Sequence, residues 1–191
     1  MKRNLALFIL GFCQLGFARL SLAGPVQAGL GANFYFVEDS LYRKIYGRAN
    51  LMFGAYLSFE LSPAFELRAE VGYSRDQGKM TLSQENIVFH IFMPAVFGVR
   101  IKILEDGRLN PYAGAGGGIV QYKEDLPPRL EDVSGSRFFY HLEGGMDIKI
   151  SPRIALDLNV RYIKATIHLE DQTTRLGGIR VGIALGYHFS P

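Results

Sequence analysis

Apolar residues alternate with small or polar ones through almost the whole chain after about its first 25 positions. The last segment shows this pattern most clearly. Every second residue from Ile179 to Phe189 is apolar, and the residues between them are glycine, alanine, arginine or histidine. Successive side chains of a β-strand point to opposite faces of the sheet, so this period of two predicts strands rather than amphipathic helices. The chain is therefore expected to be all-β.

Eight segments of this kind can be counted, most of them about 10 to 13 residues long, a length that crosses a bilayer when the strand is tilted. They lie near residues 26–37, 51–61, 65–74, 87–101, 112–122, 140–150, 154–162 and 178–189. The turns at 62–64 and 151–153 are short and fall at one end, whereas long polar connections fall at the other. This alternation is typical of an up-and-down antiparallel barrel.

The volume of the side chains indicates which face points inward. Eight strands enclose an interior only wide enough for side chains to fill, so several dozen bulky apolar groups would overfill it. With 22 glycines in the chain, the small and charged face fits inside and the apolar face is expected to contact lipid. The fold predicted is an all-β, eight-stranded antiparallel up-and-down transmembrane β-barrel. A soluble eight-stranded barrel with an apolar ligand cavity has the same periodicity and is the alternative.

The first residues have the pattern of a secretory signal peptide. Lys2 and Arg3 precede an apolar stretch, and Ser21-Leu22-Ala23 offers the small residues that a signal peptidase reads. We expect a signal peptide over residues 1–23 and the barrel over residues 24–191. Cleavage after Ala28 is a second possibility.

Removal of that segment changes the charge balance. The chain has 21 basic and 18 acidic residues, and three of the basic ones, Lys2, Arg3 and Arg19, lie in residues 1–23. The exported chain would have 18 of each, so a basic nucleic-acid interface is not predicted. The single cysteine, Cys13, lies in the same segment, which excludes an internal disulfide and a zinc ribbon.

Four segments carry a resemblance to a known family: Pro111 to Gly118, Leu142 to Asp147, Asp157 to Tyr162 and Gly177 to Phe189. They resemble the bacterial outer-membrane β-barrel domain family, which includes the OmpA transmembrane domain, OmpX and the opacity proteins. The resemblance implies a place in the cell outer membrane of a Gram-negative bacterium, with both termini in the periplasm. It also implies that Phe189 serves as the assembly signal for the barrel-insertion machinery, here displaced by Ser190 and Pro191.

Charged residues on the inward face are expected to pair with one another, because buried charge persists only when it is paired and hydrogen-bonded. The predicted structural charges of the lumen are Glu60, Glu66, Arg68, Glu70, Arg100, His141, Glu143, Asp147, Lys149, Asp157, Arg161, Arg180 and His188. A small gated pore, opened by a change of ion-pair partners, is an alternative interpretation.

The sequence predicts no catalytic, cofactor-binding or metal-binding residue. His90 and His141 are both expected to face inward, and no serine has an obvious strand spacing to either. We expect a non-enzymatic envelope protein with a structural or surface-contact role, carried by its long outer loops and in contact with lipid and lipopolysaccharide, and a monomer. A lipid A-modifying outer-membrane enzyme is the other alternative.

Overall fold

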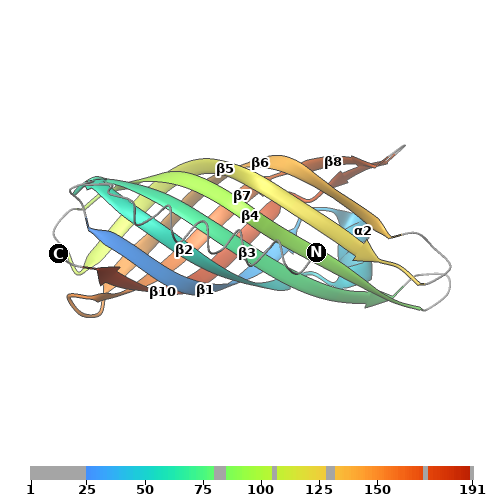
Figure 1. Ribbon diagram of the computed structural model, residues 1–191, viewed down its shortest axis with the longest axis horizontal. Helices are drawn as coiled ribbons and strands as arrows, with labels where there is room; N and C mark the ends of the chain where they lie inside the picture. Colours follow the sequence, from blue (N-terminus) through green and yellow to red (C-terminus); the bar gives the residue numbers. More distant parts are fainter. Residues whose placement is uncertain (1–24, 80–84, 105–106, 128–131, 170–171, 190–191) are drawn as a thin grey trace, which may run out of the picture.

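The chain folds into one closed antiparallel barrel in a computed structural model that describes residues 25–79, 85–104, 107–127, 132–169 and 172–189. Eight strands follow one another around the barrel, and the last pairs with the first (Figure 1). They are β1 (Val26–Val37), β2 (Asn50–Ser62), β3 (Phe65–Lys79), β4 (Asn86–Lys102), β5 (Leu109–Asp125), β6 (Val133–Lys149), β7 (Ile154–Lys164) and β10 (Gly178–Phe189). The predicted eight-stranded up-and-down topology is confirmed.

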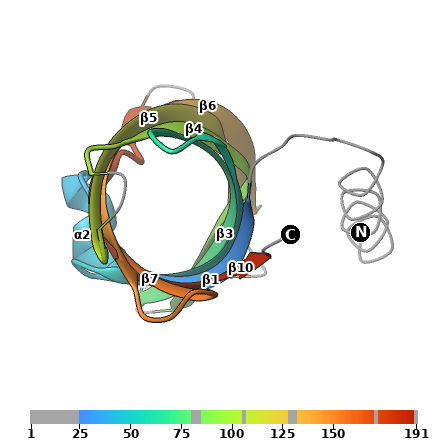
Figure 2. The ribbon, with the colours of Figure 1, turned by 90° about the vertical axis from the view of Figure 1, so that its left-hand side faces the viewer.

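Closure of the barrel depends on β1, which pairs on one side with β2 and on the other with β10. Its register with β10 runs from Val26 opposite Phe189 to Val37 opposite Gly178. Figure 2, which looks along the barrel, shows the unbroken ring that results. Because the ring is closed, the paired strands leave no open edge in their shared part, as a lipid environment requires.

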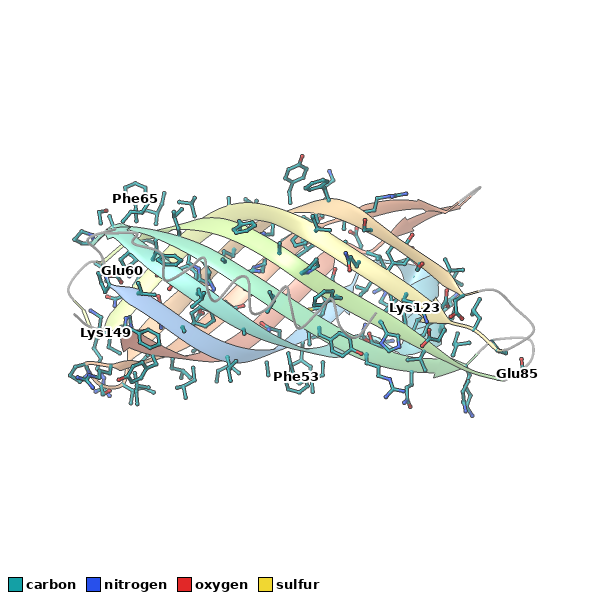
Figure 3. The ribbon with its side chains drawn as sticks, viewed as in Figure 1. Phe53, Glu60, Phe65, Glu85, Lys123 and Lys149 are labelled. Atoms are coloured by element: carbon teal, nitrogen blue, oxygen red, sulfur yellow. The ribbon has the colours of Figure 1, made fainter. Side chains whose placement is uncertain are left out.

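The outer wall of the barrel is apolar. Leu30 is 71% exposed, and the outward rows hold many other large apolar side chains with similar exposure. Figure 3 shows Phe53 and Phe65 pointing away from the barrel. Arginines and carboxylates are buried inside instead, so the apolar face does point outward as predicted, and the inverted, soluble arrangement is excluded.

A β-bulge in β4 changes which side chains face inward. The pairing with β5 shifts between Phe92 and Ala95, and the pairing with β3 shifts at the same place, next to Pro94. The strand therefore holds one extra residue, which exchanges its two faces. Below the bulge the even-numbered Arg100 and Val96 are buried, whereas above it the odd-numbered Met93 and Ile91 are buried.

Two connections that the sequence predicted as plain loops contain secondary structure. The first holds a short helix, α2 (Ser40–Tyr46), and the last holds a hairpin of β8 (Thr166–Leu169) and β9 (Gln172–Arg175). Asp39 caps the helix by accepting hydrogen bonds from the backbone of Leu41 and Tyr42. Gly47 ends it with a φ of 98°, a backbone angle that glycine adopts without strain. No helix among the described residues is long and apolar enough to span a membrane.

Candidate functional site

An ion-pair network fills the half of the barrel interior next to the short turns. Arg100 donates to Glu143 at 2.8 Å and to Asp157 at 3.0 Å, and Arg68 donates to the same oxygen of Asp157 at 2.6 Å. These side chains come from β3, β4, β6 and β7, so the network joins strands that are not neighbours in the wall. Asp157 is fully buried, and its charge is stable there because two guanidinium groups share it.

A second group of ion pairs continues the network toward β10. Arg161 donates to Glu143 at 2.6 Å and to Glu70 at 3.0 Å, and Arg180 lies 2.5 Å from the other oxygen of Glu70. Glu143 therefore bridges two arginines, and Glu70 bridges three, since Arg68 lies 3.8 Å from it. These ion pairs therefore connect strands across the interior of the barrel, whereas the hydrogen bonds of the wall connect only neighbouring strands.

Three further side chains complete the network, and the sequence did not single them out. Lys102 pairs with Glu60 and lies 3.5 Å from Glu66. The phenol of Tyr112 donates to Asp157 at 2.8 Å, and the ring of Tyr56 lies 3.5 Å from the guanidinium carbon of Arg68. Lys102 could have been found, since it follows Arg100 at the inward spacing of two residues.

The structure brings most of the predicted lumen charges together. Nine of them are buried carboxylates or guanidinium groups, and His141 is a buried ring; these are Glu66, Arg68, Glu70, Arg100, His141, Glu143, Asp147, Asp157, Arg161 and Arg180. Glu60 and His188 are only partly buried, and Lys149 is exposed at the barrel end. Among the described residues Asp147 has no ion-pair partner. It lies directly opposite Asp157, which is also a carboxylate.

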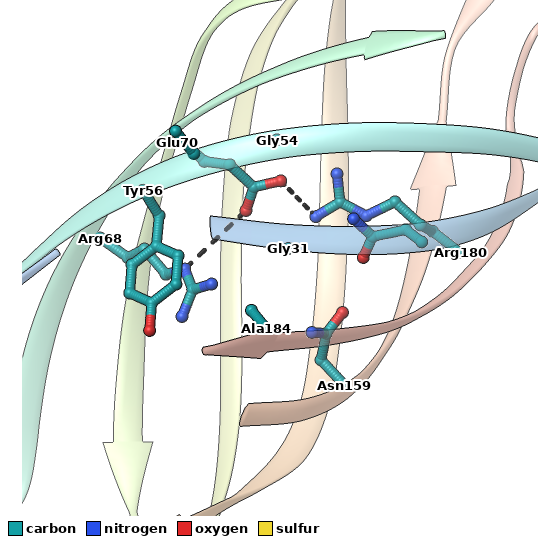
Figure 4. A pocket seen from close by; sticks show the side chains of 10 residues that line it. Gly31, Gly54, Tyr56, Arg68, Glu70, Asn159, Arg180 and Ala184 are labelled. Carbon is teal, nitrogen blue, oxygen red and sulfur yellow. Dashed lines mark ion pairs between the residues drawn. The ribbon is translucent and has the colours of Figure 1, made fainter. Parts of the chain in front are cut away.

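Two small cavities remain within the network. Figure 4 shows the first, about 10 Å³ in volume, between Tyr56, Arg68, Glu70, Asn159 and Arg180. A space of this size has room for about one water molecule. Neither of these two cavities is large enough to pass a solute.

The other half of the interior, next to the long connections, is filled by apolar side chains. Met52, Ile91, Met93 and Phe139 are each at most 1% exposed, and they belong to one buried cluster with the aromatic residues of the barrel mouth. The bulge in β4 contributes to this change of lining, because it turns Ile91 and Met93 inward. The barrel is closed twice, once by ion pairs and once by packed apolar groups.

Helix α2 lies over the mouth and is fastened on two sides. The phenol of Tyr42 donates to Asp76 on β3 at 2.8 Å and accepts from Asn50 at 2.8 Å. One turn later, Tyr46 donates to Glu124 on β5. Burial raises the pKa of the Tyr42 phenol above its ordinary range, and the nearby Asp76 carboxylate raises it further.

The outer wall carries one polar cluster near the mouth. His90 points outward, where its Nδ1 lies 2.8 Å from the hydroxyl of Tyr73 and its Nε2 lies 3.1 Å from Asp125. Lys123, beside it on β5, pairs with Asp125 and with Asp132. The prediction that His90 faces inward was wrong, because the bulge below it reverses the faces of β4. Among the described residues no cluster of His, Cys, Asp or Glu could hold a metal ion.

A closed barrel with an apolar outer wall and a charged, tightly filled interior defines a small transmembrane β-barrel. The chain belongs to the family described as the outer membrane protein beta-barrel domain, which it matches over residues 5–189. This confirms the family that the sequence resembles, and with it the outer membrane as the location.

Solved structures of the same shape come from several bacteria. Neisserial surface protein A is 15% identical with a TM-score of 0.64, covering 86% of this chain and 97% of its own. OprG from Pseudomonas aeruginosa is 12% identical with a TM-score of 0.67, covering 88% and 97%. Ail of Yersinia pestis, in complex with the heparin analogue sucrose octasulfate, is 15% identical with a TM-score of 0.58, covering 87% and 99%. At these identities the similarity shows the fold alone. The comparison with curated proteins found no match.

Proposed function

We propose that the protein is a non-enzymatic structural and surface-contact barrel of the cell outer membrane, in which the closed barrel holds the long connections at the surface. The observation that carries the proposal is the double closure of the interior. Among the described residues, an ionic half held by Arg100, Arg161 and Asp157 and an apolar half around Met93 and Phe139 fill the interior, which favours a barrel that does not conduct. What varies freely in such a barrel is the set of connections at its mouth.

Planar-bilayer recording tests the closed barrel. The wild-type protein, reconstituted singly, is expected to give no steady conductance. A variant that opens both halves, Arg161→Ala with Phe139→Ala, serves as the positive control and is expected to conduct. Discrete, recurrent openings of the wild type would instead support the small gated pore.

The orientation and partners form part of the proposal. The start of β1 and the end of β10, where Val26 pairs with Phe189, lie at the end with the short turns. We place that end in the periplasm and the long connections outside, in contact with lipid and lipopolysaccharide. Phe189, exposed beside Tyr187 at the end of β10, is proposed as the signal for the barrel-insertion machinery. Labelling of a cysteine introduced into α2 on intact cells would test the orientation, and Phe189→Ala is expected to lower the yield of assembled barrel.

A lipid A-modifying enzyme is the second candidate, and the cluster on the outer wall is the observation that favours it. A hydroxyl, an imidazole and a carboxylate follow one another in Tyr73, His90 and Asp125, the order in which a base activates an oxygen nucleophile. The hydroxyl is a phenol, however, and it faces lipid from the wall. Mass spectrometry of lipid A from cells with wild type and with His90→Ala decides the question, since an enzyme would leave a mass difference that the variant abolishes.

A further inference from the structure

Positive charge is concentrated on one side of the barrel mouth. Arg43 and Lys44 on α2, and Arg48 just after it, are exposed, as are Arg75 and Lys79 at the far end of β3. We call these five residues the α2–β3 basic surface. Among the described residues none of them forms a salt bridge, and the segment at 80–84 contains no charged residue.

The carboxylates within this part of the chain are largely engaged elsewhere. Asp39 caps α2 through two backbone hydrogen bonds. Asp76 is buried and accepts hydrogen bonds from Tyr42 and Ser74. Their charges are therefore turned away from the solvent side of the surface, and the exposed acids beside its five cations are Glu38 and Glu85, which precedes the Asn86 paired with Lys79.

The helix is held so that its cations face outward. Tyr42 and Tyr46, one turn apart, occupy the side that packs against Phe89 inside the mouth. The backbone oxygen of Ile45 lies 2.6 Å from where a Cβ on Gly78 would stand, so α2 rests directly on the end of β3. Only glycine allows this approach, and it brings the helix cations next to Lys79.

The height of the surface relative to the apolar wall indicates what it meets. Tyr73 lies on the outward face of β3, where aromatic rings mark the membrane interface. At a rise of about 3.3 Å per residue, Arg75 is about 7 Å farther along the strand and Lys79 about 20 Å. These cations therefore stand beside and just above the level of lipid headgroups.

An acidic cluster on β5 lies across β4 from this surface. Glu124 accepts a hydrogen bond from Tyr46 of α2, and Asp125 and Asp132 both pair with Lys123. A polyanion would be repelled there and attracted to the α2–β3 basic surface. The surface charge at the mouth thus changes sign across β4.

We propose that the α2–β3 basic surface binds the phosphate groups of lipopolysaccharide in the same membrane. The inference rests on the proposed function in that it needs the long connections outside the cell. Guanidinium groups match phosphate oxygens in a bidentate manner, and the surface presents three arginines and two lysines along the headgroup level.

Binding of purified lipopolysaccharide to the refolded barrel in nanodiscs tests the proposal. Each cation near a charged headgroup contributes roughly a fivefold factor in affinity. The variants Arg43→Gln/Lys44→Gln/Arg48→Gln and Arg75→Gln/Lys79→Gln are therefore expected to bind about 100-fold and about 25-fold more weakly. Lys123→Gln, a cation at the same end with two aspartate partners, is the matched control and is expected to bind as the wild type does. The heat-dependent gel shift of folded barrels verifies that each variant is folded.

Further binding experiments identify which chemical group of the ligand is bound. Lipopolysaccharide without its phosphates is expected to lose binding to the wild type, and rising salt is expected to weaken it. Equal binding by wild type and the triple variant, or equal binding of dephosphorylated lipopolysaccharide, would overturn the proposal. Binding of sucrose octasulfate but not of lipopolysaccharide would overturn it in favour of a soluble sulfated glycan. If bilayer recordings show a closed barrel but lipopolysaccharide does not bind, this inference fails while the closed barrel of the proposed function stands.

Discussion

Glu143 and Arg161 lie directly opposite each other on β6 and β7, and their side chains meet at 2.6 Å inside the barrel. Arg161 is 2% exposed and also donates a hydrogen bond to Glu70. Its removal leaves two buried carboxylates with one cation fewer each. The pair therefore lies at the centre of what holds the interior together.

Arg161→Met is expected to lower the free energy of unfolding by about 3–5 kcal/mol, because uncompensated buried charge remains. Urea unfolding in lipid vesicles, followed by far-UV circular dichroism, measures this free energy of unfolding. Lys123→Met is the control, since it removes an exposed ion pair, and the unfolding midpoint should stay where it is. Equal midpoints for the two variants would contradict a structural role for the buried network.

Asp147 and Asp157 are opposite each other as well, but only Asp157 has cationic partners. Like charges placed across a strand pair destabilise it by about 0.2–1 kcal/mol. Asp147→Asn is therefore expected to raise the free energy of unfolding by about that amount, whereas Asp157→Asn is expected to lower it by several times more. The same urea titration compares them, and a loss of stability in both would show that Asp147 has an ionic role that its surroundings do not indicate.

Gly116 on β5 pairs with Gly98 on β4 and has no space for a side chain. A Cβ there would overlap the carbonyl oxygen of Phe97 and lie 2.7 Å from the Cα of Gly98. Gly116→Ala is expected to reduce the folded fraction in the heat-dependent gel shift, because backbone on both strands would have to move. Gly144→Ala is the control, since its Cβ would have only one neighbour, at 3.7 Å. A folded fraction unchanged by either alanine would be evidence against this close packing.

Leu30 and Leu41 are both exposed leucines, but only Leu30 lies in the barrel wall. Leu30→Arg is expected to cost about 2–4 kcal/mol in vesicles if it faces the middle of the bilayer. Leu41→Arg, on α2 outside the wall, is expected to leave the unfolding midpoint unchanged. A tolerated arginine at position 30 would be incompatible with a lipid-facing wall.

Helix α2 should open more readily when its tyrosine anchor is removed. Tyr42→Phe leaves Asp76 without its phenol donor, at a cost of about 1–3 kcal/mol, so trypsin should cut after Arg43 and Lys44 about tenfold faster or more. Tyr73→Phe, which removes a hydroxyl from the outer wall, is the control. Cleavage at the wild-type rate in Tyr42→Phe would mean that the hydrogen bond to Asp76 does not hold the helix.

The same anchor gives a pH dependence of known sign. The pKa of the Tyr42 phenol is raised in the docked helix by burial and by Asp76, so docking favours the neutral phenol. This contribution is fully present below the ordinary tyrosine pKa of about 10 and is lost as the pH rises above it. Trypsin cleavage at Arg43, corrected for the activity of the protease, should therefore stay slow up to about pH 10.

Alternation along the strands was sufficient to predict the barrel and most of its inward charges. Residues such as Arg161 and Arg180 have regular strands on both sides of them, so their face follows from counting by two. The strand ends were less predictable: β3 continues to Lys79 through Arg75 and Asp76, because strands above the apolar belt pair equally well with polar residues. The apolar composition of the outward face marks the part of the wall that contacts lipid, and the hydrogen bonds between strands continue beyond that part.

His90 and α2 show why the rest could not be predicted. One extra residue beside Pro94 exchanges the faces of β4, and a count by two carried upward from Arg100 then places His90 inside. Proline in a strand was a visible sign of such a bulge. The helix has only seven residues and no repeating apolar stripe, yet Asp39 before it and Gly47 after it were legible as its caps.

The bulge at Pro94 separates two kinds of interior that meet in a single narrow tube. On the side of the short turns, each buried charge needs its ion-pair partner. A change of one charged residue there therefore requires changes in its partners on other strands. Above the bulge, shape alone is required, and aliphatic and aromatic groups can be exchanged for one another. A barrel built in this way can change its long connections by repacking the apolar half of the interior, while the ion-pair network in the other half stays the same.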